Sequence, residues 1–167
     1  GGRGKTTIAR AVHEKIACQF EACCFLDNVK EEFAYGAVHM QEKFLSRILN
    51  EKVQSLGTLD RGYRMILKRL QMKKVLIVLD DVDDLFQIET LLGKQHSFGG
   101  GSRIIITTRD KLVLSRADAI YSPKVLSGDG ALELFSQYAF RTKQPKRDYD
   151  HLLKTCCTIC SRPPLRL

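Results

Sequence analysis

The sequence predicts an α/β fold in which helices cover both faces of a central, mostly parallel sheet. Segment 75–79 is wholly apolar and mostly β-branched, and segment 103–108 is centred on three isoleucines. Such segments are typical of strands that are buried on both faces of a parallel sheet. Around them, apolar residues recur at helical spacing. The alternation of these two patterns favours a parallel sheet with crossover helices.

The helical segments each carry one apolar face. In the first, 6–20, Ile8, Val12, Ile16 and Phe20 recur at every fourth residue, which places them along one side of a helix. By the same pattern we expect further helices over 38–50, 58–71, 84–92, 128–140 and 148–157, with a short helix over 110–115.

Shorter signals complete the sequence of elements. Segments 22–29 and 119–121 are short and apolar, which predicts two more strands. Segment 31–36 is polar and ends in glycine, and segment 99–101 is all glycine after a phenylalanine, so we expect loops there. Thr58 precedes a helical segment and is expected to cap it.

The size and composition are those of a globular domain. The 167 residues suffice for one domain with a sizeable core. Apolar residues make up 44% and charged residues 28%, which excludes a disordered chain. The apolar runs are too short to span a bilayer, and no secretory signal is present, so we expect no membrane partner. The chain starts within a glycine motif, and we expect it to be a piece of a longer protein.

The charge balance is basic, with 27 Lys and Arg against 19 Asp and Glu, for a net charge of +8. Nucleic-acid binding would need these residues to form a patch or stripe. Here they are spread along the chain, so the sequence disfavours nucleic acid as a partner. A basic nucleic-acid-binding module stays open as an alternative, and it would bind more weakly as salt rises.

The six cysteines do not have the spacing of a disulfide scaffold, which favours a reducing cytosol. His151 with Cys156, Cys157 and Cys160 could suggest zinc. Structural zinc needs four convergent ligands, whereas adjacent cysteines on a helix point apart. We therefore expect no zinc.

The chain opens with GGRGKTT, the end of the phosphate-binding pattern G-x-x-x-x-G-K-[ST]. Gly2 and Gly4 would let backbone N–H groups approach phosphate oxygens, and the helix that follows would direct its positive end at the anion. Lys5 would reach the β- and γ-phosphates, Thr6 would bind Mg²⁺ and Thr7 would lie near the α-phosphate. The alternative is an ordinary glycine-rich turn before a helix.

Two carboxylates follow the apolar strand at 75–79. Asp80 would hold Mg²⁺, mostly through water, because a hard cation takes oxygen ligands at the carboxyl end of such a strand. Asp81 would act in catalysis by orienting or deprotonating the attacking water. The alternative is that Asp80, Asp81, Asp83 and Asp84 form a solvated turn and a helix cap.

Arg109 follows the strand at 103–108 at its carboxyl end, where ligands bind in open α/β sheets. There it would contact the γ-phosphate, as both a binding and a catalytic group, through charge-assisted hydrogen bonds. The alternative is an ion pair with Asp110 or with a neighbouring aspartate.

These segments together resemble the nucleotide-binding (NB-ARC) domain of plant intracellular immune receptors with leucine-rich repeats. The resemblance covers nearly the whole chain and lies in GGRGKTT at 1–7, FLDNV at 25–29, LIVLDDVD at 76–83, GSRIIITTR at 101–109 and ALELF at 131–135. Asp83 resembles the branch of the family with an N-terminal Toll/interleukin-receptor (TIR) domain.

The resemblance implies an architecture. It is a P-loop NTPase three-layer sandwich with a mostly parallel sheet over 1–125, followed over 126–167 by the start of the helical ARC1 subdomain. The strand with Arg109 would lie between the strand before the glycine motif and the strand with Asp80. That first, central strand is missing from the chain, so we expect the chain alone to fold poorly and to hydrolyse ATP weakly or not at all.

The resemblance also implies a function, that of an ADP/ATP switch with Mg²⁺ in defence signalling, with slow hydrolysis at most. Its partners would be nucleotide, the receptor's own TIR and leucine-rich-repeat domains, and pathogen effectors. The protein would be cytoplasmic, with nuclear association left open. The family's G-L-P-L-A-L motif is matched only by RPPLRL at 162–167, where Pro164 would pack near the base and sugar.

The remaining alternative from the residues is a metabolic P-loop kinase or transferase. Such an enzyme needs a mobile lid that is rich in arginine. Arg61, Arg64 and Arg69 could supply one, although their intervals place them partly on the outer face of a helix. Transfer of phosphate to a small acceptor would favour this alternative.

Overall fold

A computed structural model describes residues 4–93 and 98–124, with Gly130 and Glu133. The chain divides into a compact unit of Gly1–Tyr121 and a second unit of Ser122–Leu167. The helices predicted over 128–140 and 148–157 fall outside the described residues, apart from Gly130 and Glu133. The domain boundary after residue 125 stays a prediction.

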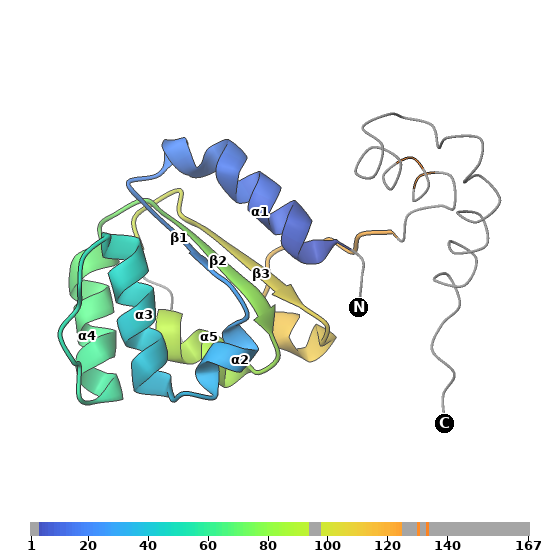
Figure 1. Cartoon of the computed structure of the whole chain (residues 1–167). Coiled ribbons are helices and arrows are strands. Elements are labelled where there is room, and N and C mark those ends of the chain that lie inside the picture. Colours follow the sequence, from blue (N-terminus) through green and yellow to red (C-terminus); the bar gives the residue numbers. More distant parts are fainter. Residues whose placement is uncertain (1–3, 94–97, 125–129, 131–132, 134–167) are drawn as a thin grey trace, which may run out of the picture. The chain divides into compact units, whose positions relative to one another are not determined.

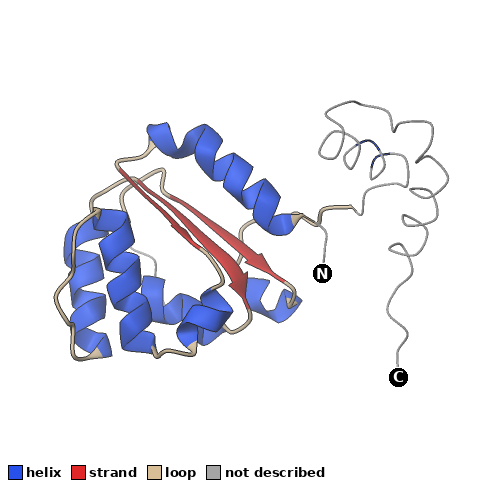
Figure 2. Cartoon of the chain, in the orientation of Figure 1, coloured by secondary structure: helices blue, strands red, loops and turns tan. Residues whose placement is uncertain are grey.

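The first unit is built on a parallel sheet of three strands, which Figure 2 shows in red. The strands are β1 (Ala22–Leu26), β2 (Val75–Val82) and β3 (Arg103–Thr108), in the order β1-β2-β3. In the register, Leu79 pairs with Leu26 on one side and with Ile106 on the other. The predicted strand over 103–108 is confirmed, whereas the central strand runs three residues beyond the predicted segment.

Helices cover both faces of this sheet, as predicted. Figure 1 shows α1 on one side and the other four α-helices on the opposite side. The helices are α1 (Lys5–Ile16), α2 (Val29–Phe33), α3 (Ala37–Leu49), α4 (Leu59–Leu70) and α5 (Leu85–Leu92), with 3₁₀ turns η1 (Ala17–Gln19) and η2 (Lys111–Leu114). The predicted cap of α4 is confirmed, because the Thr58 hydroxyl accepts from the Arg61 N–H at 3.3 Å. In the described part of the chain, none of the helices is both long and apolar enough to cross a bilayer.

The main core lies between the sheet and the helices α3 to α5. Ile77 and Leu79 of β2 pack there with Phe44 of α3 and Ile66 of α4, all without solvent exposure. Successive side chains of a strand point to opposite faces, so Leu76 and the other residues that alternate with Ile77 and Leu79 are directed toward α1 instead. The central strand is thus buried on both faces, which explains why its sequence is a continuous apolar run rather than an alternating one.

Two of the predicted elements are wrong. The loop expected over 31–36 is partly helix α2, whose first residue, Val29, is fully buried. Glu31 and Glu32 lie in the first turn of that helix, where negative charge is favourable. The strand expected over 119–121 is not formed, because these apolar residues are exposed and pair with no strand in the described part of the chain.

A close backbone approach at Gly99 yields a test of this packing. The Gly99 N–H donates to the Lys73 carbonyl at 2.9 Å, and a Cβ at Gly99 would lie 2.7 Å from backbone atoms of Met72 and Lys73. A Cβ at Gly100 would meet nothing within 4 Å. We expect Gly99→Ala to lower the free energy of unfolding by about 1–3 kcal/mol. Gly100→Ala should change it by less than about 1 kcal/mol. Urea denaturation measures the free energy of unfolding of both variants. Equal losses would contradict the close backbone contact at Gly99.

Candidate functional site

The N-terminus of α1 is open for an anion. Gly4 precedes the helix in the left-handed conformation, with φ of 69°, a region that other residues adopt at a cost. The first turn of α1 contains no acidic residue, and no side chain of residues 4–93 or 98–124 caps its N–H groups. Free N–H groups at a helix N-terminus attract phosphate and other anions.

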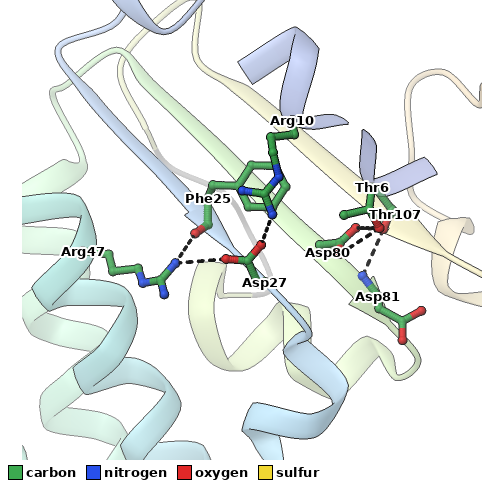
Figure 3. Close-up of polar contacts among 8 residues, drawn as sticks. All are labelled: Thr6, Arg10, Phe25, Asp27, Arg47, Asp80, Asp81 and Thr107. Atoms are coloured by element: carbon green, nitrogen blue, oxygen red, sulfur yellow. Dashed lines mark hydrogen bonds and ion pairs between the residues drawn. The ribbon is translucent and has the colours of Figure 1, made fainter. Parts of the chain in front are cut away.

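Asp80 meets this helix start from the carboxyl end of β2. Its side chain is buried, with the residue 2% exposed, and the Thr6 hydroxyl donates to Oδ1 at 2.9 Å and is 3.0 Å from Oδ2. Figure 3 shows Thr6 directly beside this carboxylate. The structure therefore brings together the two residues predicted to bind metal, which are 74 positions apart in the sequence.

Thr107 of β3 completes the environment of Asp80, and the sequence reasoning missed it. Its hydroxyl donates to Asp80 Oδ1 at 2.6 Å and accepts the Asp81 N–H at 3.0 Å (Figure 3). The available signal was the polar end of an otherwise apolar strand, but the register that sets Thr107 opposite the aspartates appears only in the folded sheet.

Asp81 faces away from Asp80 and pairs with Arg109. Its backbone is left-handed, with φ of 56°, and Figure 3 shows its carboxylate directed away from Thr6. The distance from Arg109 Nε to Asp81 Oδ1 is 3.4 Å. The predicted alternative, an ion pair of Arg109 with a neighbouring aspartate, is therefore observed. Asp110 is not that partner, because its carboxylate caps η2 by accepting from the Leu112 N–H. The Arg109 side chain is 69% exposed and remains accessible to a ligand.

The other two aspartates of this segment, Asp83 and Asp84, lie at the start of α5, where the alternative of a helix cap places them. Asp84 is the N-cap of α5 and forms a reciprocal capping box with Gln87. Asp83 lies between Lys30, 3.0 Å away, and Gln87. The hydrogen bond from Lys30 holds the pKa of Asp83 below its usual value. Of the four aspartates, Asp80 is buried, Asp81 pairs with Arg109, and the other two lie at the exposed start of α5.

The remaining predicted site residues are less constrained. Within the described part of the chain, the side chains of Lys5 and Thr7 form no hydrogen bond or ion pair. Both lie in the first turn of α1, on either side of Thr6. Gly2 and Pro164 lie outside the described residues, so their predicted roles stay predictions.

A charged cluster fixes α1 to the outer strand. Asp27, just after β1, pairs with Arg10 of α1 at 2.5 Å and with Arg47 of α3 at 3.4 Å (Figure 3). Arg10 also lies over the Phe25 ring, 4.5 Å from its centre, and Arg47 donates to the Phe25 carbonyl at 2.7 Å. The cluster therefore links the helix that carries Thr6 to the end of β1, and Arg47 occupies a carbonyl of the sheet's outer edge.

A cavity of about 560 Å³ lies near the start of β1, and its lining includes neither Thr6 nor Asp80. Its lining includes Arg69 and Glu51, which are paired with each other at 3.2 Å. In the described part of the chain, no buried polar atom without a partner belongs to this lining. We therefore place the candidate site at Thr6 and Asp80 rather than in the cavity.

The donor set at Thr6 and Asp80 fits Mg²⁺ with a phosphate ligand. Among the described residues there is no group of three or more His, Cys, Asp or Glu side chains that could hold a metal ion alone. Mg²⁺ is commonly bound by one or two protein oxygens, with water and substrate phosphates as the other ligands. One hydroxyl and one carboxylate beside an open helix N-terminus meet that requirement.

Comparisons with known proteins agree with this geometry. The family model of the NB-ARC domain matches residues 1–145. The chain is 42% identical over 171 residues to the disease resistance protein RPV1 of Vitis rotundifolia. It is 43% identical over 171 residues to RUN1 of the same plant and 39% identical over 174 residues to the TMV resistance protein N of Nicotiana glutinosa. Each match covers all of this chain but only 12%, 13% and 15% of the respective relative.

The fold, the position of the site and the family match lead to one assignment. A parallel sheet with Gly4 before α1 and a carboxylate near the end of the central strand is consistent with an α/β fold of the P-loop NTPase type. The family model covers most of the chain. The chain belongs to the NB-ARC family of nucleotide-binding domains.

Proposed function

We propose that this domain binds ADP or ATP with Mg²⁺ and acts as the nucleotide switch of a plant immune receptor. The observation that carries the proposal is the contact between the Thr6 hydroxyl and the buried Asp80 carboxylate. It joins an anion-binding helix start to a hard oxygen ligand at the carboxyl end of a parallel strand. A magnesium nucleotide requires both groups at one point.

Each predicted residue has a distinct role in this proposal. Lys5 neutralises the β- and γ-phosphates, Thr6 and Asp80 hold Mg²⁺, and Thr7 lies near the α-phosphate. Gly2 and Gly4 allow the backbone to approach the phosphates, and Pro164 packs near the base and sugar. When bound, Mg²⁺ supplies positive charge that stabilises the β- and γ-phosphate oxygens. Asp81 orients the attacking water, and hydrolysis is slow.

Arg109 gives the site a way to distinguish ATP from ADP. Its ion pair with Asp81 is partly solvated, with side-chain exposures of 69% and 33%. Such pairs contribute only about 0–1 kcal/mol, so Arg109 can leave Asp81 at little cost. A γ-phosphate offers it stronger, charge-assisted hydrogen bonds. Exchange of partners at Arg109 would then link the nucleotide state to the end of β3, as in other phosphate-dependent switches.

The wider role of the protein follows from its relatives, which are named as disease resistance proteins. The chain spans only about an eighth of their length. We propose that the domain acts with TIR and leucine-rich-repeat domains in a cytoplasmic receptor that responds to pathogen effectors. Association with the nucleus is part of the same proposal.

The ion pairing of the basic residues supports a nucleotide over a nucleic acid as ligand. In the described part of the chain, eight Lys and Arg side chains form ion pairs with carboxylates, namely Arg10, Lys30, Lys43, Arg47, Arg64, Arg69, Arg109 and Arg116. Paired charges contribute less to a field that attracts a phosphate backbone. Because each of these side chains lies beside a carboxylate, fewer basic side chains remain to form the patch or stripe that nucleic-acid binding needs.

The lysine of the glycine motif offers the first test of this proposal. We expect Lys5→Ala to weaken ADP binding about 10- to 150-fold, because a hydrogen bond to a charged group contributes roughly 1.5–3 kcal/mol. The matched control is Lys73→Ala, because Lys73 lies just before the first residue of β2, at the end of the strand that is far from the site. Calorimetric titration of ADP with Mg²⁺ measures both variants, in the chain expressed with the flanking sequence that its gene encodes.

Three results, one from that titration and two from separate assays, would refute the proposed function. Unchanged ADP affinity in Lys5→Ala would show that Lys5 does not bind the phosphates. A shift of DNA in a gel that weakens steeply with salt would favour a nucleic-acid-binding module. Transfer of phosphate from ATP to a small acceptor would favour a kinase.

The left-handed backbone of Asp81 allows a second test, which separates its side chain from its conformation. Asp81→Gly and Asp81→Ala both remove the carboxylate, so both should lower ATP turnover to the same level. A left-handed alanine is strained by roughly 1–2 kcal/mol, whereas glycine is not. Glycine loses part of this advantage through greater freedom when unfolded. We therefore expect Asp81→Gly to be more stable than Asp81→Ala by about 1 kcal/mol in urea denaturation. Wild-type turnover in either variant would contradict the role of Asp81.

A further inference from the structure

An irregularity in the sheet lies at the two neighbouring aspartates. In the register of β2 and β3, Leu79 pairs with Ile106 and Val82 pairs with Thr108. Two residues of β2, Asp80 and Asp81, therefore stand opposite one residue of β3. This two-against-one arrangement is a β-bulge, a feature that redirects side chains near functional sites.

The residue opposite the bulge is Thr107. A bulge removes a backbone group from the regular ladder, and here the Asp81 N–H donates instead to the Thr107 hydroxyl oxygen at 3.0 Å. The same hydroxyl donates its hydrogen to Asp80 Oδ1 at 2.6 Å. A hydroxyl has one donor and two acceptor sites, so a single side chain can make both bonds at once. Thr107 is 7% exposed and Asp80 is 2% exposed, which leaves little room for water to replace either bond.

These bonds give the two aspartates different orientations. The donor from Thr107 holds Oδ1 of Asp80 while the carboxylate faces Thr6, which contacts both of its oxygens. The left-handed turn at Asp81 sends the next carboxylate away, to Arg109. Without the hydroxyl, the Asp80 carboxylate would lose its short bond to β3, and the Asp81 N–H would lose its partner.

We propose that Thr107 is a positioning residue for the divalent cation that binds with the nucleotide. This inference rests on the proposed function, and it adds a residue that acts on the cation through Asp80 rather than by touching nucleotide or metal. Partners that hydrogen-bond a ligating carboxylate commonly change metal affinity by about 10- to 100-fold when they are removed. The effect should therefore appear in the magnesium dependence of ADP binding, not in ADP binding as such.

The test compares ADP affinity with Mg²⁺ and with EDTA, in the chain expressed with the flanking sequence that its gene encodes. Thr107→Val keeps the shape of the side chain and removes the hydroxyl, and we expect it to reduce the Mg²⁺-dependent gain in ADP affinity by about 10- to 100-fold. Affinity in EDTA should change by less than about twofold. Thr107→Ser restores the hydroxyl and should restore most of the gain.

The matched control is Thr90→Val in α5. Thr90 is 8% exposed, and its hydroxyl has no hydrogen-bond partner within the described part of the chain. The same substitution there removes a buried hydroxyl without touching the site, so the Mg²⁺-dependent gain should stay at the wild-type value. Should Thr107→Val not fold, Thr107→Cys takes its place, because a thiol is only a weak donor.

The outcomes separate the inference from the proposed function. An equal loss of ADP affinity with Mg²⁺ and with EDTA would give Thr107 a purely structural role and overturn the inference. A full Mg²⁺-dependent gain in Thr107→Val, or no recovery in Thr107→Ser, would overturn it as well. If the wild-type protein binds no ADP under either condition, the proposed function fails. In that case, titration with Mn²⁺ alone still tests the residue, and equal Mn²⁺ affinity in wild type and Thr107→Val overturns the inference.

Discussion

The buried carboxylate of Asp80 is the constraint on which the site depends. A charged group that is 2% exposed must be hydrogen-bonded or bound to a cation, because burying it alone costs several kcal/mol. Thr6 and Thr107 meet this requirement from a helix and from the neighbouring strand. Their bonds join the start of α1 to the ends of β2 and β3, and this point is also where the helix presents its free N–H groups. The bonds that allow Asp80 to be buried therefore also bring the start of α1 and the ends of β2 and β3 together.

Two adjacent residues of the same type acquire different environments through the backbone rather than through their chemistry. The bulge and the left-handed conformation at Asp81 turn one carboxylate into the sheet and the other toward solvent and Arg109. A regular strand would also point successive side chains to opposite faces, but it would leave Thr107 opposite only one of them. The different surroundings of Asp80 and Asp81 thus follow from one irregularity in the sheet.

The sequence could predict what depends on local pattern, and it could not predict what depends on a distant partner. The apolar run of β2 and the isoleucines of β3 identify buried strands, and Thr58 identifies a helix start, since these signals lie within a few residues. The glycine-lysine-threonine pattern and the carboxylates after the apolar strand also predict Thr6 and Asp80 as site residues, and the structure brings the two into contact. The sequence did not predict helix α2. Its first residue, Val29, is buried in the core, and the polar residues that follow give no local signal of that packing. Thr107 and the cluster at Asp27 were missed because both are defined by residues that are far away in the sequence.

Paramagnetic line broadening of backbone amide signals by Mn²⁺-ADP, with Mn²⁺ in place of Mg²⁺, locates the bound metal nucleotide on the domain. We expect the signals of Thr6, Asp80 and Thr107 to broaden first. The signal of Lys73 should persist, because it lies about 20 Å away along β2 at the usual rise per residue. Broadening centred on Lys73, or no selective broadening at all, would show that the metal nucleotide does not bind at Thr6 and Asp80.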